Sequence, residues 1–495
     1  MKLWKKTVLT GAVLFSSALA LAACGGGSGE GEAKTKSKDG SDTEVTKVIW
    51  YQVGEEPKDF DQVLTEVNKK MKDDIGLELD MRLIPDGDYQ QKMGVMINSG
   101  EEYDIAFING SDYVNYGNKG AFIDLTPHLD KELKEATDRL NDGFVKGASM
   151  GENLFAFPVN NALATTEYWV FNKELVDKYD LDVENVQSLQ DLGPVLEAFT
   201  EKNDDPSITP IGMTSTSVYA PYDFINGQTL GVPFEGDVKE IVNVYDSKDM
   251  KENMKTMHDY YQKGYILKDA ATITSNPFPL EGGNWLVKRE SGGDETSIKN
   301  ALEGLSKREL ILKPLNKAYK TTGFARVGMH AISAASKRQA ESLKLLNYVN
   351  TNKEVADLLV YGIEGQHYDR NDDDSITMTN TKDYYQGAWA LLDCYLISST
   401  TPKTEDFEKN AEIAKAFQDE SPESPILGFS FDSSNFRTQM ASINSILDQY
   451  LPSLKTGTMD PEKVLPEMLE KIEQAGNQEM KEEAQRQYDE WLSKK

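Results

Sequence analysis

The sequence predicts an α/β protein with more than one compact part. Strand and helix patterns alternate over residues 47–108, which is typical of a parallel sheet covered by helices. Hydrophobic residues make up 39% of the chain, enough to build packed cores. After an N-terminal leader about 450 residues remain, too many for one ordinary core. We therefore expect two or three domains or lobes.

The alternation can be followed element by element. β-Branched and aromatic residues over 47–51 predict a strand. Apolar residues at helical spacing over 59–72 predict a helix, and strict apolar–polar alternation over 77–83 predicts a second strand. Residues 88–98 and 103–108 repeat the helix and the strand. The order β-α-β-α-β implies parallel pairing.

The end of the chain is predicted to be helical. Apolar residues recur at spacings of three and four from Phe436 to Tyr450, which gives one apolar helical face. Asp460 is placed to cap a further helix that holds Pro461 in its first turn. We expect this helical tail to pack on the rest of the protein.

The chain opens as an export signal. A basic start precedes the uncharged run 8–23, and its length of about 16 residues is short of the ~20 needed to span a bilayer. The run ends in Leu-Ala-Ala-Cys, which resembles the bacterial lipobox and implies lipidation of Cys24; the alternative is an ordinary signal with a chance cysteine. Glycine, serine and charge then continue to residue 46, a composition typical of a flexible tether.

Charge and cysteine content narrow the function further. The formal net charge is -29, which argues against nucleic acid and anionic lipid as partners. Cys24 and Cys394 are the two cysteines, so no disulfide framework is expected. Four histidines lie far apart and form no metal-ligand pattern. We expect no cofactor.

The sequence holds none of the common catalytic or nucleotide-binding motifs. The turn after the first predicted strand, residues 50–57, is acidic and aromatic rather than the glycine-rich loop of a dinucleotide-binding domain. No phosphate loop, nucleophile elbow or His-Glu-x-x-His pattern occurs. Their absence fits a binding protein rather than an enzyme, which is the function that the family resemblance described below implies.

Aromatic and amide side chains follow several predicted strands. Trp50 and Tyr51 end the first strand, residues 109–113 follow the third, and Asn160 comes after the apolar run 154–157. Ligands of parallel sheets bind at the carboxyl ends of the strands. Sugars suit such a lining because their C–H faces stack on rings and their hydroxyls need polar partners. The alternative is that these rings belong to the core.

Several stretches resemble the extracellular solute-binding proteins of bacterial ABC importers. They are residues 102–107, 120–126, 153–158, 168–175 and 327–337. Tyr-Gly-Ile-Glu-Gly-Gln-His-Tyr over 361–368 is similar to a signature of the LipO-type oligosaccharide-binding lipoproteins, and the chain end over 435–491 is similar to theirs.

The resemblance implies a two-lobed, periplasmic-binding-protein-like fold of type II. The lobes are interleaved, a hinge joins them, and the ligand lies between them. A membrane permease would read the form closed on its ligand, and the protein would be a lipid-anchored monomer on the extracellular face of a Gram-positive cell. The implied division is 1–23 signal peptide, 24–46 lipidated cysteine and tether, 47–160 with 320–375 lobe 1, and 161–319 with 376–495 lobe 2 including the helical tail.

Strand-end placement, loop composition and the resemblance together give a set of candidate ligand-binding residues. Rings are predicted as stacking platforms and polar groups as partners of hydroxyls, while Glu364 and His367 come from the family signature. The set is Trp50, Tyr51, Asn109, Asp112, Tyr113, Asn160, Trp169, Tyr222, Trp285, Arg289, Glu364 and His367.

Three alternatives remain open at the level of sequence. A peptide receptor of the same architecture would also line its cleft with aromatics and amides. A lipid-anchored glycosidase would need two carboxylates facing each other across a cleft. The acidic run 369–374 resembles the start of a calcium loop, although it lacks the required glycine and glutamate, and an exposed acidic turn is the alternative.

Overall fold

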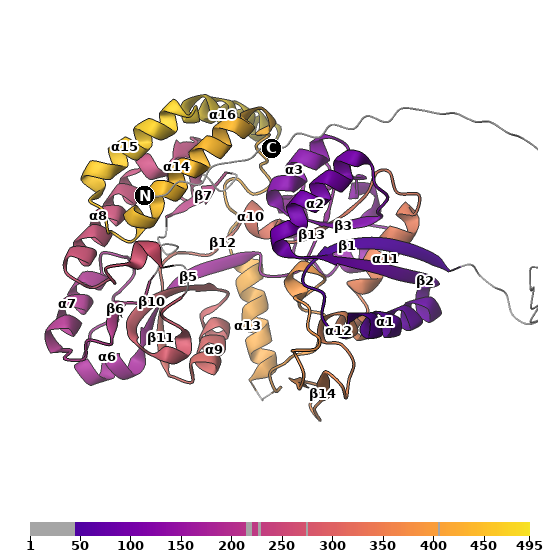
Figure 1. Ribbon diagram of the computed structural model, residues 1–495, viewed down its shortest axis with the longest axis horizontal. Coiled ribbons are helices and arrows are strands. Elements are labelled where there is room, and N and C mark those ends of the chain that lie inside the picture. Colours follow the sequence, from indigo (N-terminus) through magenta and orange to yellow (C-terminus); the bar gives the residue numbers. More distant parts are fainter. Residues whose placement is uncertain (1–44, 214–219, 226–228, 274–275, 404–405) are drawn as a thin grey trace, which may run out of the picture. The chain divides into compact units, whose positions relative to one another are not determined.

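The computed structural model describes residues 45–213, 220–225, 229–273, 276–403 and 406–495 (Figure 1). The predicted signal peptide, Cys24 and nearly all of the tether lie outside the described residues. Residues 45–495 form one unit of the chain.

The first sheet has five strands and confirms the predicted β-α-β-α-β start. Its first three strands pair in parallel, with the helices α1 (Phe60–Ile75) and α2 (Asp86–Ser99) between them in sequence. The strand order is β2 (Leu77–Ile84), β1 (Thr46–Val53), β3 (Ile105–Ile108), β13 (Met329–Ile332) and β4 (Phe157–Pro158). The short helices α3 (Gly110–Asn118), α4 (Lys134–Thr137) and α5 (Asp142–Ala148) follow β3.

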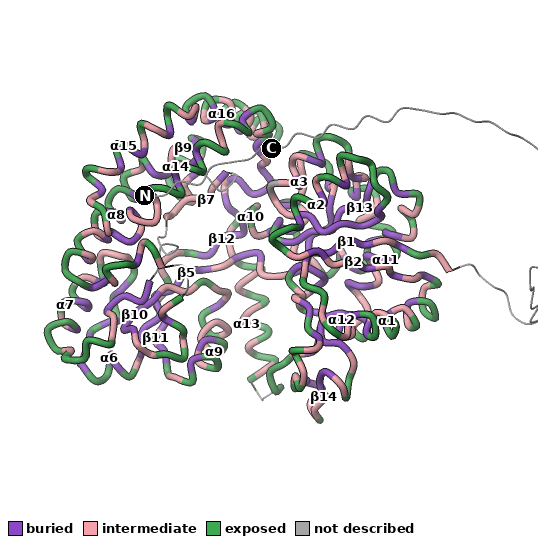
Figure 2. Tube along the Cα trace, in the orientation of Figure 1, coloured by how far each residue is buried: buried purple, intermediate pink, exposed green. Residues whose placement is uncertain are grey.

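Local signals explain these boundaries. In α1 the buried residues Phe60, Val63, Val67 and Met71 recur every three or four positions, so one face packs on the sheet. Gly76 ends the helix at φ 69°, a left-handed conformation that glycine adopts without a Cβ clash, and its N–H bonds to Lys72 O. Figure 2 shows the strands buried and the outer faces of the helices exposed.

The second sheet is mixed. Its order is β11 (Leu310–Pro314), β5 (Ala164–Asn172), β10 (Trp285–Gly292) and β6 (Thr209–Ile211), and β12 (Tyr319–Lys320) also pairs with β5. The strands β10 and β6 are parallel, and the other pairs are antiparallel. The helices of this part are α6 (Lys173–Tyr179), α7 (Leu192–Lys202), α8 (Lys248–Gln262) and α9 (Glu295–Ser306).

After the second sheet the chain returns to the first. The strand β13 pairs antiparallel with β3 and β4, and α11 (Gln339–Val349) and α12 (Lys353–Tyr361) pack nearby, α12 against α1. The first core also takes in Tyr384, Leu391, Leu392 and Leu396, which lie beyond the predicted lobe boundary at residue 375. Between the sheets in sequence lies α10 (Thr322–Ala325), and α13 (Phe407–Glu420) follows the first core.

The predicted helical tail is confirmed. It consists of α14 (Arg437–Lys455), α15 (Pro461–Gln474) and α16 (Asn477–Lys494). Ile443, Leu447, Tyr450 and Leu454 of α14 are buried in a core shared with α8 and a small sheet of β7 (Tyr222–Phe224), β8 (Leu230–Pro233) and β9 (Val242–Asn243). The Asp460 side chain accepts the N–H of Glu462 at 3.0 Å, as expected of a cap.

The acidic run 369–374 forms the hairpin of β14 (Tyr368–Arg370) and β15 (Ile376–Met378). Asp374 is paired with Arg370 at 2.8 Å and with Lys403 at 3.3 Å. Among the described residues no group of three or more metal-ligating side chains is brought together. The side chains of Arg370 and Lys403 therefore hold this acidic turn.

No helix in the described part of the chain is both long enough and apolar enough to cross a bilayer.

The burial of Asp223 predicts that the free energy of unfolding depends on pH. This residue of β7 is 8% exposed, and Ser424 Oγ donates to its Oδ2 at 2.5 Å. Burial raises the pKa of Asp223 from 3.8 to about 6, although the Ser424 hydrogen bond opposes the shift. The folded state therefore holds the proton more tightly than the unfolded state does. Ionisation costs the folded state progressively more free energy as the pH rises from about 4 to about 6.

We expect Asp223→Asn to gain stability over wild type as the pH rises through this window. The gain is about 3 kcal/mol at neutral pH and vanishes near pH 4, because asparagine keeps an acceptor for Ser424 but never ionises. Denaturant unfolding of both proteins at pH 4, 5, 6 and 7.5 measures the difference. An equal difference at all four pH values would contradict the assignment.

Candidate ligand-binding site

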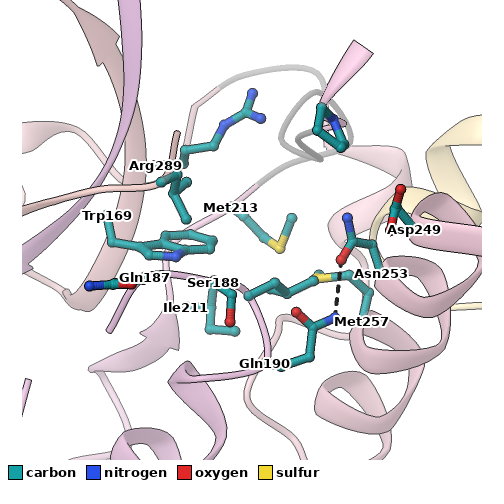
Figure 3. Close-up of a pocket in the computed structure, with 13 residues that line it drawn as sticks. Trp169, Gln187, Ser188, Gln190, Ile211, Met213, Asp249, Asn253, Met257 and Arg289 are labelled. Atoms are coloured by element: carbon teal, nitrogen blue, oxygen red, sulfur yellow. Dashed lines mark hydrogen bonds between the residues drawn. The ribbon is translucent and has the colours of Figure 1, made fainter. Parts of the chain in front are cut away.

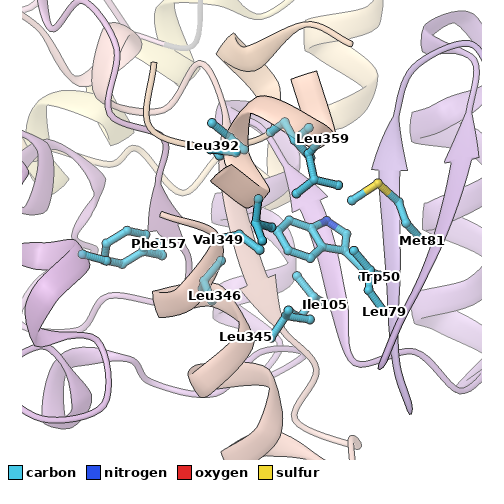
Figure 4. Close-up of a cluster of buried hydrophobic side chains, with 14 of the residues drawn as sticks. Trp50, Leu79, Met81, Ile105, Phe157, Leu345, Leu346, Val349, Leu359 and Leu392 are labelled. Atoms are coloured by element: carbon cyan, nitrogen blue, oxygen red, sulfur yellow. The ribbon is translucent and has the colours of Figure 1, made fainter. Parts of the chain in front are cut away.

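The structure corrects the prediction for Trp50. Strand β1 continues to Val53, so Trp50 lies inside the strand rather than at its end. Its side chain is 0% exposed, and Figure 4 shows the ring among Leu79, Met81 and Ile105. The indole N–H donates to Gln52 Oε1 at 3.1 Å. The ring belongs to the core and offers no face to a ligand.

Other predicted rings are also structural. Trp285 begins β10, is 0% exposed, and donates its indole N–H to Pro279 O at 3.2 Å. Tyr113 is fully buried, and its hydroxyl accepts the Phe155 N–H at 3.0 Å. Tyr51 is 8% exposed, with its hydroxyl bonded to Arg82 Nη1 at 2.8 Å. This burial contradicts the prediction that these rings are open stacking platforms.

Three polar candidates hold local structure. Asn160 is buried, and its amide donates to Arg139 O at 3.0 Å. His367 is 0% exposed; its Nδ1 accepts the Ile363 N–H at 2.9 Å, and its Nε2 lies 3.2 Å from Asp59 Oδ2. Glu364 is exposed and pairs with Arg370 at 3.2 Å. The buried hydrogen bonds of His367 thus hold the turn of the family signature, and Glu364 forms an ion pair at its surface.

Trp169 and Arg289 come together at a cavity of about 200 Å³ (Figure 3). They are directly opposite each other on the paired strands β5 and β10. The cavity lies at the carboxyl end of β6, where Ile211 and Met213 contribute, and so occupies the edge where α/β sheets bind ligands. Its other lining residues are Gln187, Ser188, Leu189, Gln190, Pro221, Asp249, Asn253, Met257 and Leu315.

The cavity combines an apolar floor with hydrogen-bonding groups. Met213, Met257 and the Trp169 ring supply apolar surface, and Figure 3 shows them beside the amides of Gln190 and Asn253. Gln190 Nε2 donates to Asn253 Oδ1 at 3.1 Å. Tyr222, another predicted binding residue, contacts the lining of the cavity, because its hydroxyl donates a hydrogen bond to Asp249 Oδ2 at 3.1 Å.

Trp169 is 5% exposed and belongs to a hydrophobic core, but one of its groups lacks a partner among the described residues. The Trp169 indole Nε1 is buried, and in the described part of the chain no atom accepts its hydrogen bond. A buried donor without an acceptor costs about 1–3 kcal/mol, so an acceptor supplied by a ligand would be favourable. This makes Trp169 the strongest of the predicted binding residues.

Charged groups border the cavity. Arg289 Nε lies 3.2 Å from Glu167 Oε2, which partly balances the guanidinium charge. Lys455, the last residue of α14, is close enough that its pKa is lowered by burial and, to a smaller extent, by the Arg289 charge. The C-terminal helices α14 and α15 contact α8, which lines the same cavity.

An aromatic residue that sequence reasoning missed lies at the carboxyl edge of the first sheet. Trp389 is 49% exposed, and its ring meets the Phe107 ring edge-on at 6.2 Å. The next residue, Ala390, accepts hydrogen bonds from Gln52 Nε2 at 2.8 Å and from His330. In the sequence this segment reads only as a short apolar stretch. A signal was available in a tryptophan outside any strand or helix pattern.

Asn109 and Asp112 stay at the end of β3 as predicted. Asn109 precedes α3 without capping it through its side chain, and Asp112 lies in the first turn. Asp112 is half-buried, and burial raises its pKa while the neighbouring Arg437 opposes the shift. It lines a separate cavity together with the C-terminal region.

Two α/β sheets with polar and aromatic groups at their carboxyl edges are the architecture of a two-lobed ligand-binding protein. Comparison with known proteins gives the family. Residues 54–356 match the bacterial extracellular solute-binding proteins, and residues 425–493 match a domain of unknown function, DUF3502. The chain belongs to the bacterial extracellular solute-binding proteins, so the predicted family and fold are confirmed, and its relatives are binding proteins.

Similar proteins include relatives from Streptococcus pneumoniae and Bacillus subtilis. Over 100% of both chains, this one is 32% identical to a carbohydrate ABC transporter substrate-binding protein of Streptococcus pneumoniae serotype 4. It is 24% identical to lipoprotein LipO of Bacillus subtilis over 60% of this chain and 62% of that protein. The crystal structure of the N-glycan transport solute binding protein NgtS from S. pneumoniae is 31% identical, covers 90% of this chain and 99% of its own, and gives a TM-score of 0.80. The NgtS complex with Man5GlcNAc, also 31% identical, covers 91% and 99% and gives 0.70.

The contrast between the buried Trp50 and the half-exposed Trp389 predicts unequal losses of stability. Trp50→Ala opens a cavity in the first core and should lower the free energy of unfolding by about 3–5 kcal/mol. Trp389→Ala removes a half-exposed ring and should cost about 1 kcal/mol or less. Denaturant unfolding measures both, and equal losses would contradict the placement of the two rings.

Proposed function

We propose that this solute-binding protein captures an oligosaccharide related to the high-mannose glycans and delivers it to a membrane permease for import. The observation that carries the proposal is the cavity at Trp169, with its buried, unpaired indole N–H beside amide and carboxylate groups. The Man5GlcNAc and Man1GlcNAc complexes of NgtS, a relative about one-third identical over nearly its whole length, support this class of ligand.

The chemistry of the two sheet edges suits a sugar. A sugar hydroxyl can accept from Trp169 Nε1 and donate to Asp249 or Asn253, since hydroxyls act in both roles. The exposed Trp389 ring offers a face for the C–H side of a pyranose. A peptide would place its backbone groups less densely than a sugar places its hydroxyls, so we favour the carbohydrate.

Binding would be coupled to a hinge motion of two interleaved lobes built on the two sheets. The lower TM-score against the glycan complexes of NgtS, 0.70 and 0.71 compared with 0.80, supports a change of arrangement on binding. The permease would read the ligand-closed form, and no bond of the ligand would be broken. The protein acts as a receptor and not as an enzyme.

Trp169→Phe is the sharpest test because it removes the unpaired indole N–H and keeps an aromatic ring. We expect the affinity for Man5GlcNAc to fall by about 2- to 10-fold, the worth of one hydrogen bond, without loss of melting temperature. The matched control is Trp285→Phe, whose indole already has an acceptor in Pro279. It should lower the melting temperature and leave the affinity unchanged. Calorimetric titration and thermal melts of both variants decide the matter, and unchanged affinity in Trp169→Phe would refute the role of this residue.

We further propose that Cys24 carries a lipid that anchors the protein to the outer face of the cell membrane as a monomer. The Leu-Ala-Ala-Cys exit and the polar tether support this arrangement, which would hold the receptor near its permease at high local concentration.

Wild-type protein from its own host should partition into the detergent phase and show the added mass of a diacylglyceryl group. Cys24→Ser should stay in the aqueous phase, since the lipid has no attachment point. Intact-mass measurement of both proteins is the test, and an unmodified Cys24 on the mature wild type would disprove the anchor.

A further inference from the structure

Three segments that connect the cores of the protein are hydrogen-bonded to one another. In sequence they lie between β4 and β5, between β11 and β13, and between α13 and the C-terminal core. Strand β12 pairs with the start of β5. Lys320 of β12 also donates its N–H to Pro422 O at 2.8 Å and accepts the Ser424 N–H at 2.8 Å. We call residues 164–165, 319–320 and 422–424 the crossing ribbon.

The hairpin of β7 and β8 contacts this ribbon through side chains. Asp223 of β7 is 8% exposed, and its Oδ2 accepts the hydroxyl of Ser424 at 2.5 Å. The Phe234 ring, just after β8, stacks on the Tyr319 ring with the centroids 4.4 Å apart and 10° between the planes. The Tyr319 hydroxyl donates to Glu235 Oε1 at 3.0 Å. The hairpin therefore contacts two of the segments that form the ribbon.

The same hairpin also contacts the candidate ligand-binding cavity. Pro221, immediately before β7, lines the cavity and accepts the Phe234 N–H at 3.1 Å. The Tyr222 hydroxyl donates to Asp249, another residue of the lining. Successive side chains of a strand point to opposite faces, so Tyr222 reaches the cavity lining while Asp223 reaches the ribbon.

Close backbone packing holds the hairpin together. The strands β7 and β8 are paired over 222–224 and 231–233. A Cβ on Gly231 would lie 2.9 Å from Asp223 O and 2.8 Å from the Val244 side chain, so this close approach requires glycine. The hairpin also contributes Ile225, Leu230 and Val232 to the C-terminal core. A displacement at one face of such a packed element is carried to its other face.

We propose that the β7–β8 hairpin couples ligand binding in the Trp169 cavity to hinge movement at the crossing ribbon. A ligand that bonds to Asp249 or packs on Pro221 would favour one position of the hairpin, and Asp223 and Phe234 would then favour the matching arrangement of the ribbon. Such coupling requires contacts that differ between the open and the closed form. This inference rests on the proposed function, because it assumes that a ligand enters this cavity and that the lobes close around it.

Substitutions at the two ribbon contacts test the coupling. Phe234→Ala removes the ring that stacks on Tyr319, and its half-buried position should tolerate the change. Ser424→Ala removes the hydroxyl that donates to Asp223. Phe234→Tyr keeps a stacked ring and serves as the conservative variant.

The chain offers a matched control for each substitution. Phe224→Ala removes another half-buried ring of the same hairpin, which lies against Tyr245 instead of the ribbon. Ser421→Ala removes a hydroxyl three residues before Ser424, and this hydroxyl donates to Phe417 O of α13. Neither control touches a contact between the hairpin and the ribbon.

Two measurements separate coupling from direct contact with the ligand. Calorimetric titration with Man5GlcNAc gives the affinity, and small-angle X-ray scattering gives the radius of gyration without glycan and at saturation. All proteins carry Cys24→Ser so that no lipid is attached, and thermal melts check their folding. Trp169→Phe is the comparison, because it should weaken binding and still contract fully once it is saturated.

We expect Phe234→Ala and Ser424→Ala to weaken Man5GlcNAc binding by about fivefold or more, the lower end of typical coupling between sites. At saturation both should contract much less than the wild type, since the bound hairpin no longer moves the ribbon. Phe224→Ala, Ser421→Ala and Phe234→Tyr should bind and contract as the wild type does.

Ribbon variants that contract as fully as the wild type at saturation would overturn the coupling, even where their affinity falls. Phe234→Leu covers the case in which Phe234→Ala does not fold, because it keeps apolar volume without a planar ring; it too should contract only in part. Wild-type protein that does not bind Man5GlcNAc would overturn the proposed ligand. Wild-type protein that binds it without contracting would overturn the proposed hinge motion and the coupling with it.

Discussion

The backbone pairing of β13 with β3 and β4 is the constraint on which the candidate site depends. This strand enters the first sheet only after the chain has built the second, so the first sheet is complete only when the chain has crossed between the sheets and returned. His330 of β13 is fully buried, and burial lowers its pKa to about 3, so the ring stays neutral. His330 Nε2 and the Gln52 side-chain amide both hydrogen-bond to Ala390 O. These bonds place the neighbouring Trp389 at the edge of the sheet. The pairing that closes the sheet thus also positions an exposed ring.

Much of this architecture could be predicted because it depends on local patterns. Apolar periodicity located the first strands and helices, and the cap at Asp460 located α15. Trp50 could not be placed in the same way. Whether a ring at the end of a predicted strand is buried depends on where the strand stops, and β1 runs two residues beyond Tyr51. Strand boundaries follow from the partner strand β2, which pairs with β1 as far as Val53, and this pairing is not visible in the local sequence.

The candidate site was predicted only in part, for a related reason. Trp169 and Arg289 are far apart in sequence, and antiparallel pairing of β5 and β10 sets them opposite each other. The family resemblance indicated the segment that holds Trp169, but it did not indicate Arg289, which lies opposite Trp169 in the sheet. Trp389 was missed because its exposure is set by contacts with Phe107 and Gly328, both distant in sequence. For His367 the signature allows either a ligand-binding role or a buried structural role, and its hydrogen bonds with Ile363 and Asp59 hold a turn.

The tryptophan rings of this fold differ in their exposure and in whether the indole N–H has an acceptor. Buried rings such as Trp50 and Trp285 fill the cores, and each donates its indole N–H to an acceptor within the chain. Trp389 lies outside the strands and is 49% exposed, whereas Trp169 lies inside β5 and is buried but has an indole N–H without an acceptor among the described residues. On the proposed function, a ligand that stacks on Trp389 and accepts from Trp169 would gain contacts while Trp50 and Trp285 continue to fill the cores.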